Sequence, residues 1–331
     1  MSMETEKLHP LKFEPLLKRT LWGGERILSF KHLDLPHNHV GESWEISAVK
    51  GAESIVAEGE LKGKTLTELL VLYKEKLVGR ENYARYGDRF PLLVKFIDAG
   101  KDLSIQVHPD DELAGKRHGS FGKNEMWYVV DAQEGAGLYA GFSQEISLNE
   151  YEERVAAGSF SEVLQWYGVG RGDVFYVPFR RVHGIGKGVF VVEIQQTSDI
   201  TYRIYDYLRK DETGRCRELH TELAAEAIDF ADVGKDAKIN YCLQKNDPVD
   251  LLATPCFSAS LYDINEPMEC DYSDLDSFVA YICVGGGGVL MDNGGNEIYL
   301  NQGETILFPA VVQNVMIRPG ESGMKFLETY V

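Results

Sequence analysis

The stretch Leu103-Ser-Ile-Gln-Val-His-Pro-Asp-Asp111 is the part of the chain from which both fold and chemistry can be argued. Successive side chains of a β-strand point to opposite faces, so residues two apart share a face. One face of a strand here would carry three apolar side chains, Leu103, Ile105 and Val107. The other would carry three polar ones, Ser104, Gln106 and His108. Because buried polar groups are costly without partners, we expect these to have one, and a metal ion is a candidate.

The bulk composition narrows the class of protein. A length of 331 residues predicts about two domains, at roughly 150 residues per domain. The formal net charge of −18 argues against general binding to nucleic acid or to an anionic membrane, which needs a basic surface. A few convergent Lys and Arg side chains could still create a positive pocket for a small anionic substrate.

The compartment is predicted from the cysteines and the N-terminal segment. The five cysteines are odd in number and too far apart for a Cys-x-x-Cys motif: Cys216, Cys242, Cys256, Cys270 and Cys283. This pattern favours free thiols in a reducing compartment. The charged N-terminal segment leads into no long apolar run, so we expect no signal peptide and no transmembrane segment. We therefore expect a cytoplasmic protein.

Hydrophobic periodicity predicts a β-rich chain with short helical insertions. Helical spacing occurs in three segments, near residues 65–89, 146–168 and 217–231. Thr65 and Glu68 form a capping-box sequence at the start of the first. Strands are expected at residues 42–47, 91–97 and 103–108, and the last two, joined across Gly100, should form a hairpin.

An internal repeat indicates two similar β-barrels. Gly172-Asp-Val-Phe-Tyr-Val-Pro178 and Gly303-Glu-Thr-Ile-Leu-Phe-Pro309 share a Gly-acid start, four strand residues and a final Pro. His183 lies five residues after the first Pro, whereas Asn314 lies five after the second. We therefore expect only the first barrel to bind metal. A drop in hydrophobic density near residues 234–248 suggests domains of residues 1–235 and 236–331.

The candidate metal ligands come from separate predicted strands and loops. Glu125 follows Lys123 by two residues, so both share a face of the strand that begins near Gly122. The full candidate set is Gln106, His108, Glu125 and His183. Two imidazoles, a carboxylate and an amide oxygen suit Zn²⁺ but exclude few other first-row metals. A second His-rich sequence, Pro36-His-Asn-His39, has no strand pattern and is interpreted as a surface loop.

Three motifs then resemble a known family. Ser104-Ile-Gln-Val-His-Pro-Asp110, Gly41-Glu-Ser-Trp-Glu45 and Glu193-Ile-Gln-Gln-Thr-Ser-Asp-Ile-Thr-Tyr-Arg203 are similar to sequences of the type I phosphomannose isomerases, in their compact bacterial branch. The resemblance runs from about Leu11 to Tyr207. It implies a mainly β fold of two cupin-like barrels, or jelly rolls, with short helical insertions and a second barrel that lacks metal ligands. It also implies interconversion of mannose 6-phosphate and fructose 6-phosphate through an enediol, with one Zn²⁺ per chain held by the four candidate ligands.

The resemblance assigns further roles residue by residue. Lys123 falls at the family's active-site lysine, and Asp199 with Arg203 matches an Asp-x-x-x-Arg pair. These three are the candidate catalytic residues. The candidate contacts for the phosphate or the rest of the substrate are Ser104, Lys123, Arg203 and Arg209, and Lys210 is an alternative to Arg209. The general base stays open between Asp199 and a zinc-bound hydroxide. Asn124 and Ile185 depart from the family pattern, which usually has Pro and an aromatic residue there.

Other functions stay open at this point. An iron cupin oxygenase also uses His and carboxylate ligands with open positions, and a non-catalytic sugar-binding or regulatory cupin needs no proton transfer. Gln106 and the basic residues favour the isomerase over the oxygenase, and Lys123, Asp199 and Arg203 favour it over a binder. The Asp199 and Arg203 side chains could instead form a plain ion pair that orients a loop. The expected partner is a small sugar phosphate, with no nucleic acid and no membrane, and the expected state is a monomer or a homodimer.

Overall fold

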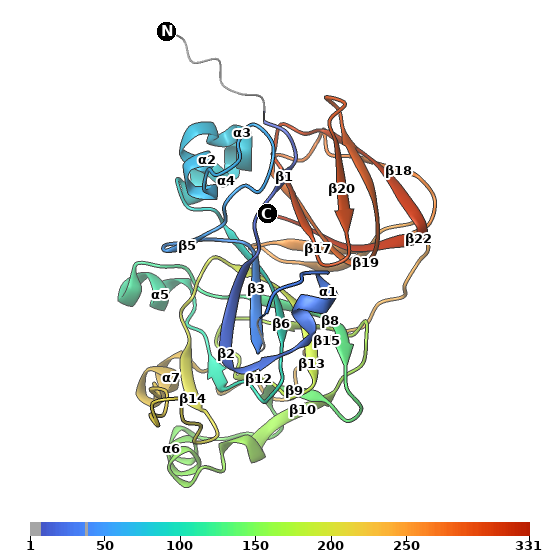
Figure 1. The fold of residues 1–331 in the computed structure, drawn as a ribbon. Coiled ribbons are helices and arrows are strands. Elements are labelled where there is room, and N and C mark those ends of the chain that lie inside the picture. Colours follow the sequence, from blue (N-terminus) through green and yellow to red (C-terminus); the bar gives the residue numbers. More distant parts are fainter. Residues whose placement is uncertain (1–7, 37–38) are drawn as a thin grey trace.

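The computed structural model describes residues 8–36 and 39–331 of the chain (Figure 1). Strands dominate it, so the prediction of a mainly β protein is confirmed. His37 of the expected His-rich surface loop lies outside the described residues, whereas His39 is described and has its Nδ1 atom 3.4 Å from the carbonyl oxygen of Gly23. No helix in the described residues is long and apolar enough to cross a lipid bilayer. All five cysteines are free.

Two sheets build the first barrel. One runs in the order β15 (Lys238–Ile239), β11 (Val174–Val177), β8 (Glu125–Ala132), β13 (Val189–Gln196), β6 (Leu92–Asp98), β3 (Val40–Ile46), β2 (Leu16–Gly24). The other runs in the order β10 (Leu164–Gly168), β9 (Gly137–Phe142), β12 (His183–Ile185), β7 (Ile105–Val107), β14 (Tyr202–Tyr205). A buried cluster joins them, since Trp127 and Phe175 of the first sheet pack with Leu138 and Ile185 of the second. The two sheets therefore face each other across one core.

The expected hairpin between residues 91–97 and 103–108 is wrong. β6 is already paired on both edges, with β13 and with β3, so it has no free edge for the strand that follows it. The chain instead crosses to the opposite sheet, where β7 pairs with β12 and β14. Leu103 precedes β7 and packs in the cluster of Trp127, whereas Ile105 and Val107 pack in another. Alternation predicted that Leu103, Ile105 and Val107 share one buried face. This is wrong for Leu103, which packs in a different cluster from the other two.

The first predicted helical segment is three short helices. They are α2 (Leu66–Tyr73), α3 (Glu75–Val78) and α4 (Arg80–Tyr86). The capping box of Thr65 and Glu68 is present at the start of α2. The breaks fall at Lys74 and Gly79, whose φ angles of 49° and 94° do not fit a right-handed helix. Two further short helices, α1 (Arg26–Phe30) and α5 (Asp111–His118), were not expected.

The other two helical segments are shorter than the sequence predicted. Within residues 146–168 the helices are α6 (Leu148–Ala157) and the 3₁₀ turn η1 (Phe160–Val163), and the remainder is strand β10, which finds backbone partners on β9. Within residues 217–231 only α7 (Thr221–Ala227) is helical. The backbone just before α7 is held by β14 instead, because Arg203 N donates to His220 Nδ1 and His220 N donates to Arg203 O.

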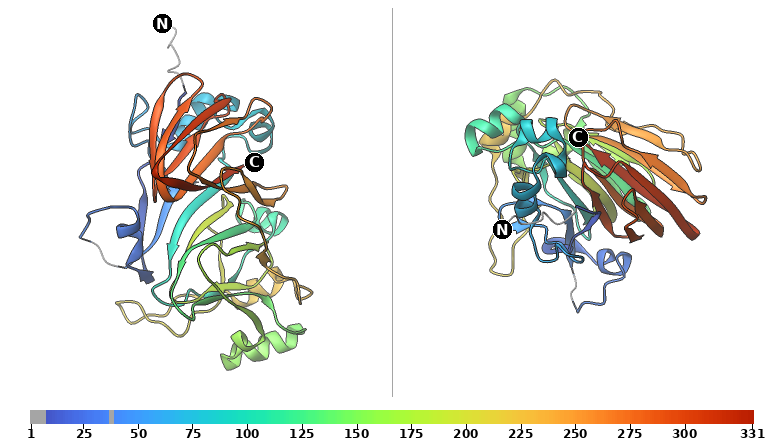
Figure 2. Two further views of the ribbon diagram at one scale, coloured as in Figure 1. Left: turned by 90° about the vertical axis from the view of Figure 1, so that its right-hand side faces the viewer. Right: turned by 90° about the horizontal axis from the view of Figure 1, so that it is seen from above.

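One eight-stranded sheet forms the second barrel. Its main path is β1 (Leu11–Lys12), β21 (Thr305–Phe308), β19 (Val279–Asp292), β22 (Asn314–Tyr330), β17 (Ser258–Ile264), β16 (Val249–Ala253), with β18 (Met268–Asp271) on β22 and β20 (Glu297–Asn301) on β19. A separate two-stranded sheet pairs β4 (Ala48–Val49) with β5 (Ala52–Glu53). Figure 2 shows the orange and red strands gathered at the opposite end of the molecule from α6.

The N-terminal strand belongs to this last sheet. Leu11 of β1 lies opposite Leu307 of β21, so the first described strand pairs with one of the last. The start of α4 also contacts the C-terminal part of the chain. Asp276 accepts hydrogen bonds from the backbone N–H groups of Arg80 and Glu81, at 3.0 and 3.1 Å. The proposed domain boundary near residue 235 stays a prediction. Strand β1 precedes that boundary in the sequence but belongs to the sheet of the second barrel.

The two barrels share a pairing pattern as well as the repeated sequence. β11 pairs with β8 in the first barrel as β21 pairs with β19 in the second. The residue before Pro178, Val177, lies opposite Glu125. The residue before Pro309, Phe308, lies opposite Val279. By register, a valine therefore stands in the second barrel at the place of the candidate metal-binding carboxylate.

Candidate metal centre and active site

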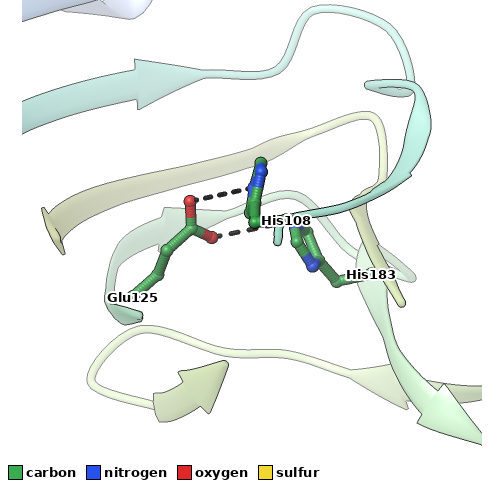
Figure 3. A group of neighbouring side chains, drawn as sticks. All are labelled: His108, Glu125 and His183. Atoms are coloured by element: carbon green, nitrogen blue, oxygen red, sulfur yellow. Dashed lines mark ion pairs between the residues drawn. The ribbon is translucent and has the colours of Figure 1, made fainter. Parts of the chain in front are cut away.

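Three buried side chains of the first barrel converge on one point (Figure 3). His108 follows β7, Glu125 begins β8 and His183 begins β12. Glu125 Oε1 lies 3.3 Å from His108 Nε2, and Glu125 Oε2 lies 3.7 Å from His183 Nε2. One ligand atom from each residue lies within 4.8 Å of the others. Among the described residues this is the one such group of His, Cys, Asp and Glu, and it lies in the first barrel.

Both imidazoles are oriented by backbone carbonyls. His108 Nδ1 donates to Ile200 O at 2.8 Å, and His183 Nδ1 donates to Arg181 O at 2.9 Å. With the proton on Nδ1, the Nε2 lone pair of each ring faces Glu125. Burial, reinforced by the Lys123 charge, lowers the pKa of His108 to about 4. Burial also lowers the pKa of His183. Both rings are therefore neutral near pH 7, which is the form that binds a metal.

The Glu125 carboxylate is buried, ionised and short of hydrogen bonds. Burial opposes its ionisation, but the charge of Lys123 holds the pKa of Glu125 well below its ordinary value. Lys123 Nζ lies 2.6 Å from Oε1, yet neither carboxylate oxygen accepts a hydrogen bond of normal geometry. Lys123 supplies one positive charge beside this buried anion, but both oxygens still lack a hydrogen bond, and a bound metal ion would occupy their lone pairs. The donor set and this unsatisfied carboxylate therefore fit a divalent metal ion.

Gln106 lies next to the three convergent residues. Its Nε2 atom is 3.4 Å from His183 Nε2, and its Oε1 atom accepts a hydrogen bond from Ser104 Oγ at 3.1 Å. Oxygen and nitrogen of an amide exchange places when the group turns by half a rotation. That turn would bring the amide oxygen, which is the ligating atom, to the side of the imidazoles.

A cavity of about 330 Å³ opens beside these residues. Its charged lining consists of Glu42, Lys95, Lys123, Glu193, Asp199, Arg203 and Arg217. Its polar and apolar lining consists of Trp22, Ile97, Leu103, Ser104, Gln106, Trp127, His183, Ile185 and Thr201. A small polar molecule with one anionic end fits a pocket of this size and lining.

The cavity brings together most of the residues predicted from the sequence. Ser104, Gln106, Lys123, Asp199 and Arg203 all line it. The Asp199 and Arg203 side chains form no ion pair with one another, so the loop-orienting ion pair considered for them is not observed. Arg209 is not part of the lining. Its guanidinium donates to Asp102 O and pairs with Asp206.

Residue spacing alone did not predict the ion pair between Lys95 and Glu193, which lines the cavity. Lys95 Nζ lies 3.0 Å from Glu193 Oε1, and Trp127 Nε1 donates to Glu193 Oε2 at 3.0 Å. Burial alone would lower the pKa of Lys95, but the facing Glu193 carboxylate raises it above its ordinary value. The available signal was a charged residue inside the apolar part of each of two strands, β6 and β13.

Comparisons with known proteins point to one family. Residues 11–136 match the family model described as phosphomannose isomerase type I, catalytic domain. The fold matches the crystal structure of the mannose 6-phosphate isomerase from Bacillus subtilis with a TM-score of 0.88 and 32% identity, over 98% of this chain and 100% of the other. A putative mannosephosphate isomerase from Archaeoglobus fulgidus, at 21% identity and a TM-score of 0.79, shares the fold over 98% of this chain and 99% of its own.

Curated relatives extend the match along the chain. Mannose-6-phosphate isomerase ManA of Bacillus subtilis is 38% identical over 78% of each chain. Mannose-6-phosphate isomerase of Streptococcus mutans is 35% identical over 92% of this chain and 94% of its own. Fold and site thus define an isomerase built on cupin-like barrels, as the sequence predicted. More narrowly, the chain belongs to the type I phosphomannose isomerase family.

Proposed function

We propose that the chain is a zinc-dependent aldose–ketose isomerase that interconverts mannose 6-phosphate and fructose 6-phosphate through an enediol. The observation that carries the proposal is the buried, ionised Glu125 between two neutral imidazoles, beside a cavity with basic residues. The names of the relatives support the choice of substrate. The five free cysteines favour a reducing compartment such as the cytoplasm, and a monomer or homodimer remains the expected state.

The metal would be held by His108, Glu125, His183 and the amide oxygen of Gln106. When bound, Zn²⁺ supplies positive charge that polarises the sugar oxygens nearby. Two neutral imidazoles, one carboxylate and one amide leave that ion with a net positive charge of about one. The same donors would also accept other first-row metals, so the preference for zinc needs its own measurement.

The remaining roles belong to residues of the cavity. Arg203 and Ser104 are suited to bind the phosphate, because a guanidinium and a hydroxyl both donate to phosphate oxygens. Lys123 is suited to stabilise negative charge on the enediolate oxygen. Asp199 lines the cavity and forms no salt bridge within residues 8–36 and 39–331, and it is our candidate for moving the proton between C1 and C2. Trp22 and Trp127 give the cavity apolar walls that exclude water from the reacting carbons.

One assay tests the proposal directly. The purified protein is stripped with a chelator, reloaded with Zn²⁺, Co²⁺, Fe²⁺ or Mg²⁺, and given mannose 6-phosphate, and fructose 6-phosphate is measured. We expect product only with a metal present and the highest rate with Zn²⁺. Oxygen consumption with Fe²⁺ would indicate an oxygenase instead. Binding of mannose 6-phosphate without turnover under any metal would also contradict the proposal.

A further inference from the structure

The loop after β14 carries a cluster of arginines around one buried carboxylate. Asp206 follows the end of β14 and is only 4% exposed. Arg217 Nε donates to Asp206 Oδ2 at 2.8 Å, and Arg217 Nη2 donates to Asp206 Oδ1 at 2.6 Å. The Arg209 guanidinium also donates to Asp206 Oδ1. Two parallel hydrogen bonds fix both the position and the plane of the Arg217 guanidinium.

This arrangement directs Arg217 toward the cavity of the metal centre. Arg217 and Arg203 both line that cavity, whereas Arg209 and Asp206 do not. The bonds to Asp206 use Nε and Nη2 of Arg217, so Nη1 is left with no hydrogen bond among the described residues. On Arg203, Nη1 donates to Glu218 O at 2.9 Å, but Nε is buried and has no hydrogen-bond partner in the part of the chain that the structure describes. Both guanidinium groups thus line the cavity, and each has a donor that is left without a hydrogen bond among the described residues.

The cluster carries more positive charge than it neutralises. Arg209 and Arg217 both pair with Asp206, and the nearby Arg203 forms no ion pair in the described part of the chain. The excess of two positive charges matches a phosphate monoester, which carries about −1.5 to −2 at pH 7. Burial lowers the pKa of Arg203, and the nearby charge of Arg217 lowers it further, as expected for a cluster without a full set of counter-charges.

We propose that Arg217 is a second substrate-binding guanidinium beside Arg203, held toward the phosphate of the sugar by Asp206. The proposal rests on the proposed function for the identity of the sugar phosphate. Asp206 is a positioning residue, since it acts through Arg217 and does not line the cavity. Arg209 also pairs with Asp206 and ties the loop to Asp102 O, and it does not line the cavity.

Kinetics of a matched pair of variants tests this assignment. Arg217→Gln removes the proposed phosphate contact, and Arg215→Gln removes the same charge from an exposed residue of the same loop. In the zinc-loaded enzyme we expect Arg217→Gln to raise KM for mannose 6-phosphate by about 10-fold or more, with kcat little changed, because a charged hydrogen bond to the bound substrate is lost. The inhibition constant of inorganic phosphate should rise in parallel. Arg215→Gln should leave both values at the wild-type level.

Asp206→Asn tests the positioning role. The neutral amide keeps the size of the side chain but loses the charge that anchors Arg217, so we expect KM to rise in the same direction by a smaller factor. In the Asp206→Asn background, Arg217→Gln should then raise KM by a smaller factor than it does in the wild type, because the two residues act as one unit. Full additivity of the two KM changes would overturn the positioning role.

A purely structural role for Arg217 gives a different result. Arg217→Gln would then lower the melting temperature and kcat, with KM and phosphate inhibition equal to those of Arg215→Gln, and the proposal would fail. If the wild type does not convert mannose 6-phosphate, the proposed function fails but this inference keeps its own test. Inorganic phosphate should still raise the melting temperature of the zinc-loaded wild type more than that of Arg217→Gln. An equal shift in both proteins would overturn the inference.

Discussion

Val279 occupies in the second barrel the register position that Glu125 occupies in the first. Each lies opposite the residue that precedes the Pro of the repeated sequence, Val177 or Phe308. A valine offers no lone pair to a metal, and no imidazole follows where Asn314 replaces the histidine of the first copy. The duplicated framework therefore retains its strands and its turn while only one copy keeps the side chains that can bind an ion.

Metal content should depend on one copy alone. We expect His183→Ala to reduce bound zinc from about one per chain to well below that value, since one of two imidazole ligands is lost. Asn314→Ala should leave the stoichiometry unchanged. Metal analysis after dialysis against a weak chelator measures both. An equal loss of zinc in the two variants would refute the assignment of the metal to the first barrel.

Replacing only one residue of the buried Lys95–Glu193 ion pair should lower the free energy of unfolding strongly. Lys95→Met leaves the Glu193 carboxylate buried without its counter-charge, so we expect a loss of about 3–5 kcal/mol in the free energy of unfolding. Adding Glu193→Gln removes the unpaired charge and should recover a large part of the loss. Urea unfolding of the metal-loaded protein measures both values. A double variant as unstable as Lys95→Met would contradict this explanation.

The contact between Asp276 and α4 should stabilise the chain modestly. Asp276→Ala removes the acceptor for two backbone N–H groups at the start of the helix, and we expect a loss of about 1 kcal/mol in the free energy of unfolding. Asp274→Ala is the matched control, because Asp274 is an exposed carboxylate two residues away. If both substitutions have the same small effect, Asp276 does not act as a helix cap.

Glu328 should make the protein less stable as pH rises. This side chain is buried in the second barrel and accepts a hydrogen bond from Tyr262 Oη at 3.3 Å. Burial raises the pKa of Glu328 above the ordinary value of 4.5. The unfolded chain therefore releases its proton first, and the free energy of unfolding falls as pH increases from about 4.5 through the higher folded pKa.

Glu328→Gln isolates this effect. The variant mimics the protonated side chain, so its stability relative to the wild type should grow over the same pH interval and level off above the folded pKa. Urea titrations at a series of pH values give the difference. A difference that stays constant with pH would show that Glu328 does not titrate differently in the folded and unfolded states.

The sequence predicted the residues around His108 because their spacing is local. Strand alternation relates Gln106 to His108 and Lys123 to Glu125, and the repeat draws attention to His183. Alternation failed at Leu103, where the chain leaves one sheet for another. It could not show that β6 had no free edge, because that depends on strands β3 and β13, which are far away in the sequence.

Residues that depend on cross-strand register or on an irregular loop were missed. Lys95 lies opposite Glu193, a relation visible only once β6 and β13 are paired. Arg217 reaches the cavity through a loop without periodicity, held by a carboxylate eleven residues earlier in the chain. The sequence placed Arg209 at the phosphate and did not single out Arg217. The resemblance to the family indicated a basic position near Arg209, but it did not show which guanidinium of this loop lines the cavity.

The pairing of β1 with β21 has a consequence for how the chain folds as it is made. Leu11 is synthesised about 300 residues before its partner Leu307. At 5–20 residues per second the interval is roughly 15 to 60 s. During that time the first strand has no edge to join, however early the metal-binding barrel closes. The edge of the sheet that β1 forms with β21 can therefore be completed only after residues 305–308 have been synthesised.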